Sequence, residues 1–205
     1  MALDTYANLQ TAIISYAFRT GDSEFTAAVP DFITLVESRL NRVLRVREME
    51  AAATLTLTNS AGTLPTDYLE FRRVVANTSP TTPLELVTPD FASTEYGTTY
   101  SGFPVHFTII GSTLTVYPST TATVALSYYQ KIPALSDSST ANWLLAKAPE
   151  LYLYGALVEA APFMMDDGRT QTWGTLFQKA LKDLQDADTG ARYARAVSRV
   201  SGPTP

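Results

Sequence analysis

Few residues of this chain have the types and spacing that catalysis requires. The chain has no cysteine and one histidine, His106, which stands in the apolar segment FPVHFTIIG. A zinc site needs several cysteine or histidine ligands, and no GxSxG motif is present to position a serine nucleophile. The phosphate-binding motifs GxGxxG and GxxxxGK[ST] are absent as well. We therefore interpret His106 as a structural residue of a strand and expect no metal, no cofactor and no catalytic residue.

The acidic residues give two further candidates for chemistry. Asp166 and Asp167 precede a glycine, but a calcium loop needs a glutamate at its twelfth position, where this chain has Phe177. Glu159 lies in a strongly apolar segment, and glycoside hydrolysis would need a second carboxylate across a cleft from it. We expect Glu159 to pair with an arginine instead. The sequence thus favours a protein that is not an enzyme, with a cell-wall hydrolase as the weakest alternative.

Apolar residues recur at helical spacing near both ends of the chain. The first predicted helix covers residues 4–20, with Asp4 or Thr5 as its N-cap. The second is expected to begin at Pro30, and a later one at Pro149, because proline is favoured in the first turn of a helix. The helix after Pro149 is apolar on most of its circumference, which predicts that it is buried. A last helix carries an apolar face formed by Trp173, Phe177, Ala180, Leu181 and Leu184.

Residues 51–130 show a different pattern. Segments such as ATLTLT, VHFTIIG and TVALSYYQ alternate in polarity or are rich in β-branched residues, and glycine or proline separates them. Gly111-Ser112 is typical of the two-residue turn of a β-hairpin. Short strands at this spacing predict a small antiparallel barrel or sandwich.

The stretch YYQKIPALSDSSTANWLL (residues 128–145) returns the chain from strand to helix. Neither terminal pair of helices has enough partners to bury its apolar face alone, so both ends should pack together. The predicted fold is α+β, an antiparallel bundle of about four helices formed by residues 1–50 and 131–190. Residues 51–130 form an inserted β module, and residues 191–205 form an extended C-terminal arm.

Charge is unevenly distributed along the chain. The net charge is −5, yet no acidic residue follows Asp188, whereas Arg192, Arg195 and Arg199 do. This asymmetry predicts a basic arm that seeks an acidic partner, and the acidic body argues against a sequence-specific DNA reader. No window approaches the roughly 18 apolar residues of a membrane span, so we expect no membrane association.

Three arginines flank the apolar stripe of the second helix: Arg39, Arg42 and Arg45. One interpretation is a solvated helix face with ion pairs to nearby glutamates, namely Glu37, Glu48 and Glu50. The other is a subunit interface, because arginine is enriched at such surfaces. The sequence leaves both open.

The chain resembles the head-to-tail adaptor (connector) proteins of tailed bacteriophages, especially the short-tailed type. The resemblance is carried by five segments in the same order: PDFITLVESRLNRVLRVREMEAAATLTL, LPTDYLEFRRVV, GFPVHFTIIGSTLTVYP, YYQKIPALSDSSTANWLL and APELYLYGALVEAAPFMMDDGRTQTWGTLFQKALKDL. Together they cover nearly the whole chain.

This resemblance implies a virion structural protein that forms a ring, usually of twelve subunits, beneath the portal. Its partners would be the portal, tail or nozzle proteins and copies of itself, with viral DNA passing through the channel without sequence-specific binding. Such a ring extends the DNA channel and gives a platform for the tail at the capsid vertex, after assembly in the host cytoplasm. The C-terminal segment of such adaptors commonly docks on the portal, which implicates Arg192, Tyr193, Arg195 and Arg199.

Other functions remain open at this point. A different ring or tail-completion protein would have similar properties. A carbohydrate- or receptor-binding tail module would instead use the aromatic residues of the β module to stack on sugars. The candidates for such stacking are Tyr96, Tyr100, Phe103 and Tyr117.

Overall fold

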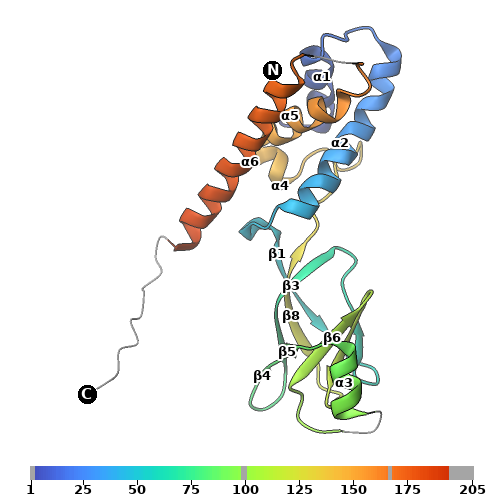
Figure 1. Cartoon of the computed structure of the whole chain (residues 1–205), viewed down its shortest axis with the longest axis vertical. Helices are drawn as coiled ribbons and strands as arrows, with labels where there is room; N and C mark the ends of the chain where they lie inside the picture. The colour runs from blue at the N-terminus through green and yellow to red at the C-terminus, as the bar shows by residue number, and fades with distance from the viewer. Residues whose placement is uncertain (1–2, 98–100, 166–167, 194–205) are drawn as a thin grey trace, which may run out of the picture. The chain divides into compact units, whose positions relative to one another are not determined.

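A computed structural model of the chain describes residues 3–97, 101–165 and 168–193. The chain divides into two compact units (Figure 1). The helical unit combines Met1–Glu48 with Ile132–Pro205, and the β unit comprises Met49–Lys131. The α+β class is confirmed. No helix in the described ranges has the length and apolar character needed to cross a membrane.

The described part of the helical unit contains five α-helices. They are α1 (Tyr6–Tyr16), α2 (Ser23–Val43), α4 (Trp143–Lys147), α5 (Pro149–Ala160) and α6 (Thr170–Tyr193). A 3-10 turn, η1 (Arg47–Met49), lies where the chain leaves this unit. The helices exceed the predicted four because α4 and α5 are separate, and the predicted four-helix bundle is not observed. Ala148 leaves the helical conformation between them, as expected for a residue before proline.

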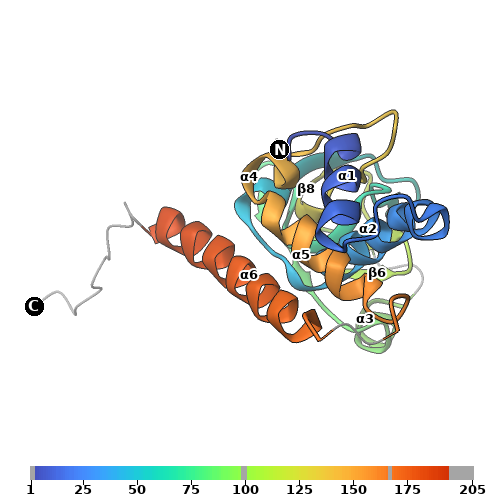
Figure 2. The same ribbon diagram turned by 90° about the horizontal axis from the view of Figure 1, so that it is seen from above.

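Helix α5 is the centre of the helical unit. It packs against α1, α2, α4 and α6, and Figure 2 shows it between α6 and α1. Its buried side chains point in most directions, which confirms the prediction of a buried helix: Leu151, Tyr152, Leu153, Ala156, Leu157 and Ala160. Because the neighbouring helices come from both ends of the chain, neither end could form this core alone.

The start of α1 agrees with the prediction from the sequence, whereas the start of α2 differs from it. Thr5 caps α1 and accepts a hydrogen bond from the backbone N–H of Asn8 at 3.3 Å. The second helix begins at Ser23 rather than at Pro30, and Pro30 lies inside it. Phe25 and Val29, in the added turns, are fully buried. Their burial outweighs the helical hydrogen bond that proline cannot donate.

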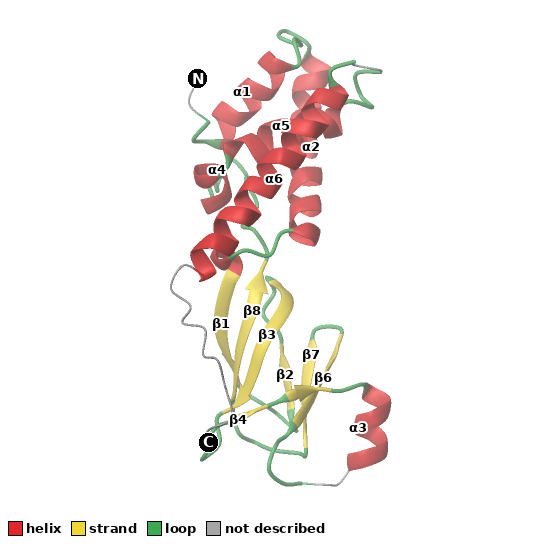
Figure 3. Cartoon of the chain, turned by 60° about the vertical axis from the view of Figure 1, so that its left-hand side comes forward, coloured by secondary structure: helices red, strands yellow, loops and turns green. Residues whose placement is uncertain are grey.

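The β unit has two four-stranded sheets and not the closed barrel that was one of the two predicted alternatives (Figure 3). The first sheet has the order β1-β8-β3-β4, with bounds Glu50–Leu55, Val124–Gln130, Tyr68–Ala76 and Thr82–Pro83. The second has the order β2-β7-β6-β5, with bounds Ala61–Thr63, Thr113–Tyr117, His106–Ile110 and Glu85–Leu86. Neighbouring strands are antiparallel except β5 and β6, which are parallel. Helix α3 (Pro89–Tyr96) lies against β6.

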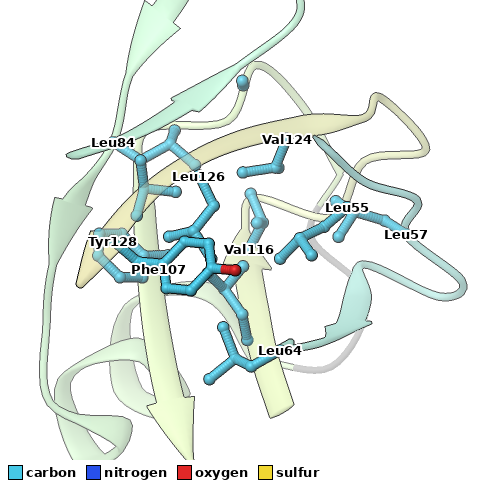
Figure 4. Close-up of a cluster of buried hydrophobic side chains, with 12 residues drawn as sticks. Leu55, Leu57, Leu64, Leu84, Phe107, Val116, Val124, Leu126 and Tyr128 are labelled. Carbon is cyan, nitrogen blue, oxygen red and sulfur yellow. The ribbon is translucent and has the colours of Figure 1, made fainter. Parts of the chain in front are cut away.

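One apolar core lies between the two sheets, as in a sandwich. Figure 4 shows side chains from both sheets converging, among them Leu126 and Tyr128 of β8, Phe107 of β6 and Val116 of β7. The predicted turn at Gly111 joins β6 to β7 in a left-handed conformation, with φ of 59°.

Strands β4 and β5 are separate although one residue divides them, because the chain changes sheets at Leu84. The N–H of Leu84 donates to Val74 O in the first sheet, and that of Glu85 donates to Val105 O beside the second.

The close packing of α5 can be tested at Gly155. A Cβ added there would lie 2.9 Å from Val36 Cγ1 of α2 and 3.1 Å from Phe177 Cε2 of α6. We expect Gly155→Ala to lower the free energy of unfolding by about 1–3 kcal/mol, more than alanine gains in helix propensity. Urea unfolding measures the change.

Gly174→Ala in α6 is the matched control, because no atom outside the adjacent backbone of α6 lies within 4 Å of an added Cβ there. We expect this variant to gain up to about 1 kcal/mol from helix propensity. Equal effects at Gly155 and Gly174 would show that α2, α5 and α6 do not pack this closely.

Candidate functional site

Two side chains of α2 hold residues 132–142, which lead the chain from the β unit to α4 and which we name the return segment. Asn41 Oδ1 accepts a hydrogen bond from Ile132 N at 2.8 Å, and Glu37 Oε1 accepts one from Leu135 N at 2.8 Å. Residues four apart lie on the same face of a helix, so α2 presents both acceptors to the segment. The return segment is thereby fixed to α2 through hydrogen bonds that its backbone N–H groups donate.

Asn142 and Tyr152 complete this polar cluster. Asn142 Nδ2 donates to Pro133 O and to Tyr152 Oη, both at 2.7 Å, and Asn142 Oδ1 caps α4 by accepting from the N–H of Leu145 at 2.8 Å. The Tyr152 hydroxyl donates to Glu37 Oε1 at 3.2 Å. The cluster therefore links α2, the return segment, α4 and α5.

Glu37 is a buried carboxylate, 6% exposed, that the sequence interpretation placed on a solvated face. Burial raises its pKa above the ordinary value, although the hydrogen bonds from Leu135 N and Tyr152 oppose that change. Burial and the neighbouring Glu37 likewise raise the pKa of the Tyr152 hydroxyl. A signal was present, because Glu37 occupies a position in the apolar repeat of Ile33, Leu40 and Leu44. No group of metal-binding side chains occurs in the described ranges. The hydrogen bonds of the cluster join three helices to the return segment.

The three arginines of α2 have different environments. Arg39 Nη1 lies 3.0 Å from Glu159 Oε1, and its guanidinium group lies 5.9 Å from the ring centroid of Phe177. Glu159 is thus paired with an arginine, as predicted. Arg45 Nη1 donates to the carbonyls of Asn41 and Leu44 and so caps the end of α2. Arg42 is exposed.

A shallow pocket of about 290 Å³ lies between α2 and α6, and we name it the α2–α6 groove. Its lining residues are Arg39, Leu40, Val43, Phe177, Gln178 and Leu181. Leu40, Phe177 and Leu181 are buried, whereas the Val43 side chain is 50% exposed. The groove therefore combines an apolar floor with an arginine at its edge.

The end of α6 is anchored through Asp188. Asp188 Oδ1 accepts hydrogen bonds from the backbone N and Nε of Arg47, each at 3.1 Å, and Oδ2 accepts one from Arg192 Nε at 2.7 Å. Burial alone would raise the pKa of Asp188, but these hydrogen bonds outweigh it and hold the pKa below its ordinary value. The helix continues to Tyr193, so Arg192 is helical and not part of an extended arm. The Tyr193 side chain, Arg195 and Arg199 lie outside the described residues.

The aromatic residues proposed for sugar stacking do not form one open platform. The rings of Tyr96 and Tyr117 stack on each other at 5.8 Å, and Tyr96 Oη lies 2.5 Å from His106 Nδ1. His106 thus takes part in an aromatic cluster of the β unit. Phe103 is 52% exposed, and Tyr100 lies outside the described residues.

A surface that the sequence did not predict lies at the turns that join α1 to α2 and α5 to α6. Phe18 is 80% exposed, Met165 is 87% exposed and Phe163 is 46% exposed. We name these three residues the turn patch. A pocket of about 550 Å³ adjoins it, lined by Arg19, Asp22, Glu24, Pro162, Phe163, Met164 and Met165.

The chain matches a known protein family over most of its length. The family model of the SU10 adaptor protein matches residues 4–200. The chain belongs to this family. It is a phage head-to-tail adaptor family, so the resemblance seen in the sequence is confirmed. Membership makes the chain a phage structural adaptor, with a place in the virion and an association with portal and tail proteins. No curated protein matches the chain.

The raised pKa of Glu37 predicts how stability depends on pH. The folded state holds the Glu37 proton more tightly than the unfolded chain, whose glutamates titrate near 4.5. The stabilising contribution is therefore complete below that ordinary value and is lost as the pH rises through the folded pKa. We expect Glu37→Gln to remove this loss, because glutamine keeps an acceptor oxygen without a charge. Urea unfolding at about pH 5 and about pH 8 measures the difference.

Glu37→Ala is the control for the hydrogen bonds. It leaves Leu135 N and the Tyr152 hydroxyl without their acceptor, so it should be destabilised at both pH values by about 1–3 kcal/mol. If Glu37→Gln kept the pH dependence of the wild type, another group would be responsible for it.

Proposed function

We propose that this adaptor forms a ring of twelve copies between the portal and the tail, extends the DNA channel and gives the tail its attachment platform. The observation that carries this proposal is the family match over residues 4–200, which spans both structural units. Function then resides in surfaces that bind the portal, tail proteins and neighbouring copies. The DNA passes through the channel without sequence-specific contacts.

Charge supports this assignment in two ways. The net charge of −5 suits a channel through which DNA slides, because like charges repel the phosphates. The residues after Asp188 are basic and free of acids, which suits docking on an acidic surface of the portal. Asp188 fixes the last turns of α6 up to Tyr193, the last described residue before this basic segment.

Native mass spectrometry of the full chain with the portal protein of the same phage tests the proposal. We expect a complex in which one ring of adaptor subunits joins one portal ring. A carbohydrate-binding module or a hydrolase would leave the portal unbound. An adaptor that stayed separate from the portal at high concentration would overturn the proposal.

The basic C-terminal segment gives a second test. Deleting residues 194–205 should abolish docking on the portal without unfolding the helical unit, because the contact of Arg192 with Asp188 is retained. Reversing Arg195 and Arg199 to glutamate should weaken binding at low salt on the order of tenfold, and less at high salt. Sedimentation of adaptor with portal measures both effects.

Reversal of Lys179 and Lys182, which are exposed on α6, is the matched control for net charge. The control variant should bind the portal nearly as the wild type does. If the shortened chain still bound the portal fully, the C-terminal segment would not be the docking element.

A further inference from the structure

The turn patch holds large apolar side chains in solvent on a strained backbone. Phe18 has φ of 55° and Met165 has φ of 52°, a left-handed conformation that non-glycine residues rarely adopt. Such strain is found where a function requires a particular side chain. Here the two strained residues are also among the most exposed apolar residues of the described chain.

The Phe18 ring of the patch is contacted by Arg169. The Arg169 guanidinium lies 4.9 Å from the ring centroids of both Phe18 and Trp173, and Arg169 Nη1 donates to Tyr16 O at 3.2 Å. Arg169 therefore lies against the rings of Phe18 and Trp173 and is tied to the end of α1. A pre-ordered apolar surface loses little entropy on binding, which is typical of protein interfaces.

Phe163 is supported in a similar way. Its ring contacts those of Phe25 and Phe32, with centroid distances of 5.9 Å and 5.8 Å. Phe25 is fully buried, so the half-exposed ring of Phe163 extends the core to the surface. Aromatic residues and methionine, the residue types of the turn patch, are enriched at interfaces.

The turn patch and the α2–α6 groove lie at different places on the helical unit. Figures 1 and 2 show the turn between α1 and α2 at the start of α2. The groove is lined by the last turns of α2 and by residues in the first half of α6. Two different surfaces on one subunit are what a head-to-tail ring contact requires.

The charges beside the two surfaces are complementary. Glu24 lines the pocket next to the turn patch, and Arg42 lies three residues from Arg39 on the edge of the groove. Both side chains are exposed, and within the described ranges neither forms an ion pair. Each also matches the dipole of α2, since Glu24 lies in its first turn and Arg42 in its last. The experiments must separate these two roles.

We propose that the turn patch of one subunit docks in the α2–α6 groove of the next copy, with Glu24 of the first facing Arg42 of the second. Phe18, Phe163 and Met165 cover the apolar floor of the groove, and the ion pair fixes the register. The contact rests on the proposed ring function and assigns the two surfaces that build the ring. The occupant of the groove is a second copy of this chain and not the portal.

Cysteine cross-linking tests the contact directly, because the natural chain has no cysteine. In the double variant Glu24→Cys with Arg42→Cys, the two thiols of one subunit are about 27 Å apart along α2, too far for a short bismaleimide. We expect a ladder of linked subunits up to the full ring when the adaptor is assembled on the portal. Each single variant should stop at dimers at most.

Charge exchange separates the contact from the helix dipole. Glu24→Arg alone and Arg42→Glu alone should each weaken ring assembly on the order of tenfold, because each places like charges together. The double variant restores opposite charges between copies and should restore assembly. It opposes the dipole at both ends of α2, so it should also be the least stable of the three in thermal unfolding.

The outcomes distinguish this inference from the proposed function. If the wild type forms a ring on the portal but the double cysteine variant gives no ladder, or links adaptor to portal, the contact is wrong and the adaptor function stands. If the double charge variant assembles no better than the single variants, the ion pair is wrong. If the wild type forms no ring with the portal, both the function and the contact fail.

Discussion

Glu37 and Asn41 of α2 accept hydrogen bonds from backbone N–H groups of the return segment, and the packing of the helical unit depends on these bonds. Without them, α5 and α6 would have no fixed path back to α1 and α2, whose apolar faces they cover. Asn142 and Tyr152 extend the same cluster to α4 and α5. Polar groups in such a place must all be paired, since an unpaired one costs the full desolvation free energy. Glu37, the buried glutamate of the described helical core, therefore holds the return segment in place through its hydrogen bonds.

An adaptor binds other proteins through its surface. Three arginines of this chain are used within the subunit. Arg39, Arg45 and Arg192 are each bound within the chain, where they fix helix ends and helix pairs. The two most exposed large apolar side chains of the described residues, Met165 and Phe18, belong to the turn patch, and both have a positive φ. Each unit has its own apolar core, so neither needs its outer surface in order to bury apolar side chains.

The sequence alone determined the features that depend on neighbouring residues. The cap at Thr5, the turn at Gly111 and the helix start at Pro149 each follow from a few adjacent side chains, and the structure confirms all three. The apolar circumference of α5 predicted its burial for the same reason. The order of five such segments also sufficed to indicate the family.

Only the tertiary structure decided the features that depend on residues far apart in the chain. Pro30 lies inside α2 because Phe25 finds a buried place among other helices, and no local pattern reveals that partner. The chain changes sheets at Leu84, because Leu84 pairs with Val74 of one sheet and Glu85 pairs with Val105 beside the other. Glu37 is buried by a segment almost 100 residues away, as its contact with Leu135 shows. The exposure of Phe18 could not be predicted from the sequence either, because large apolar side chains are usually buried. Only the positions of the neighbouring helices show that this ring faces solvent.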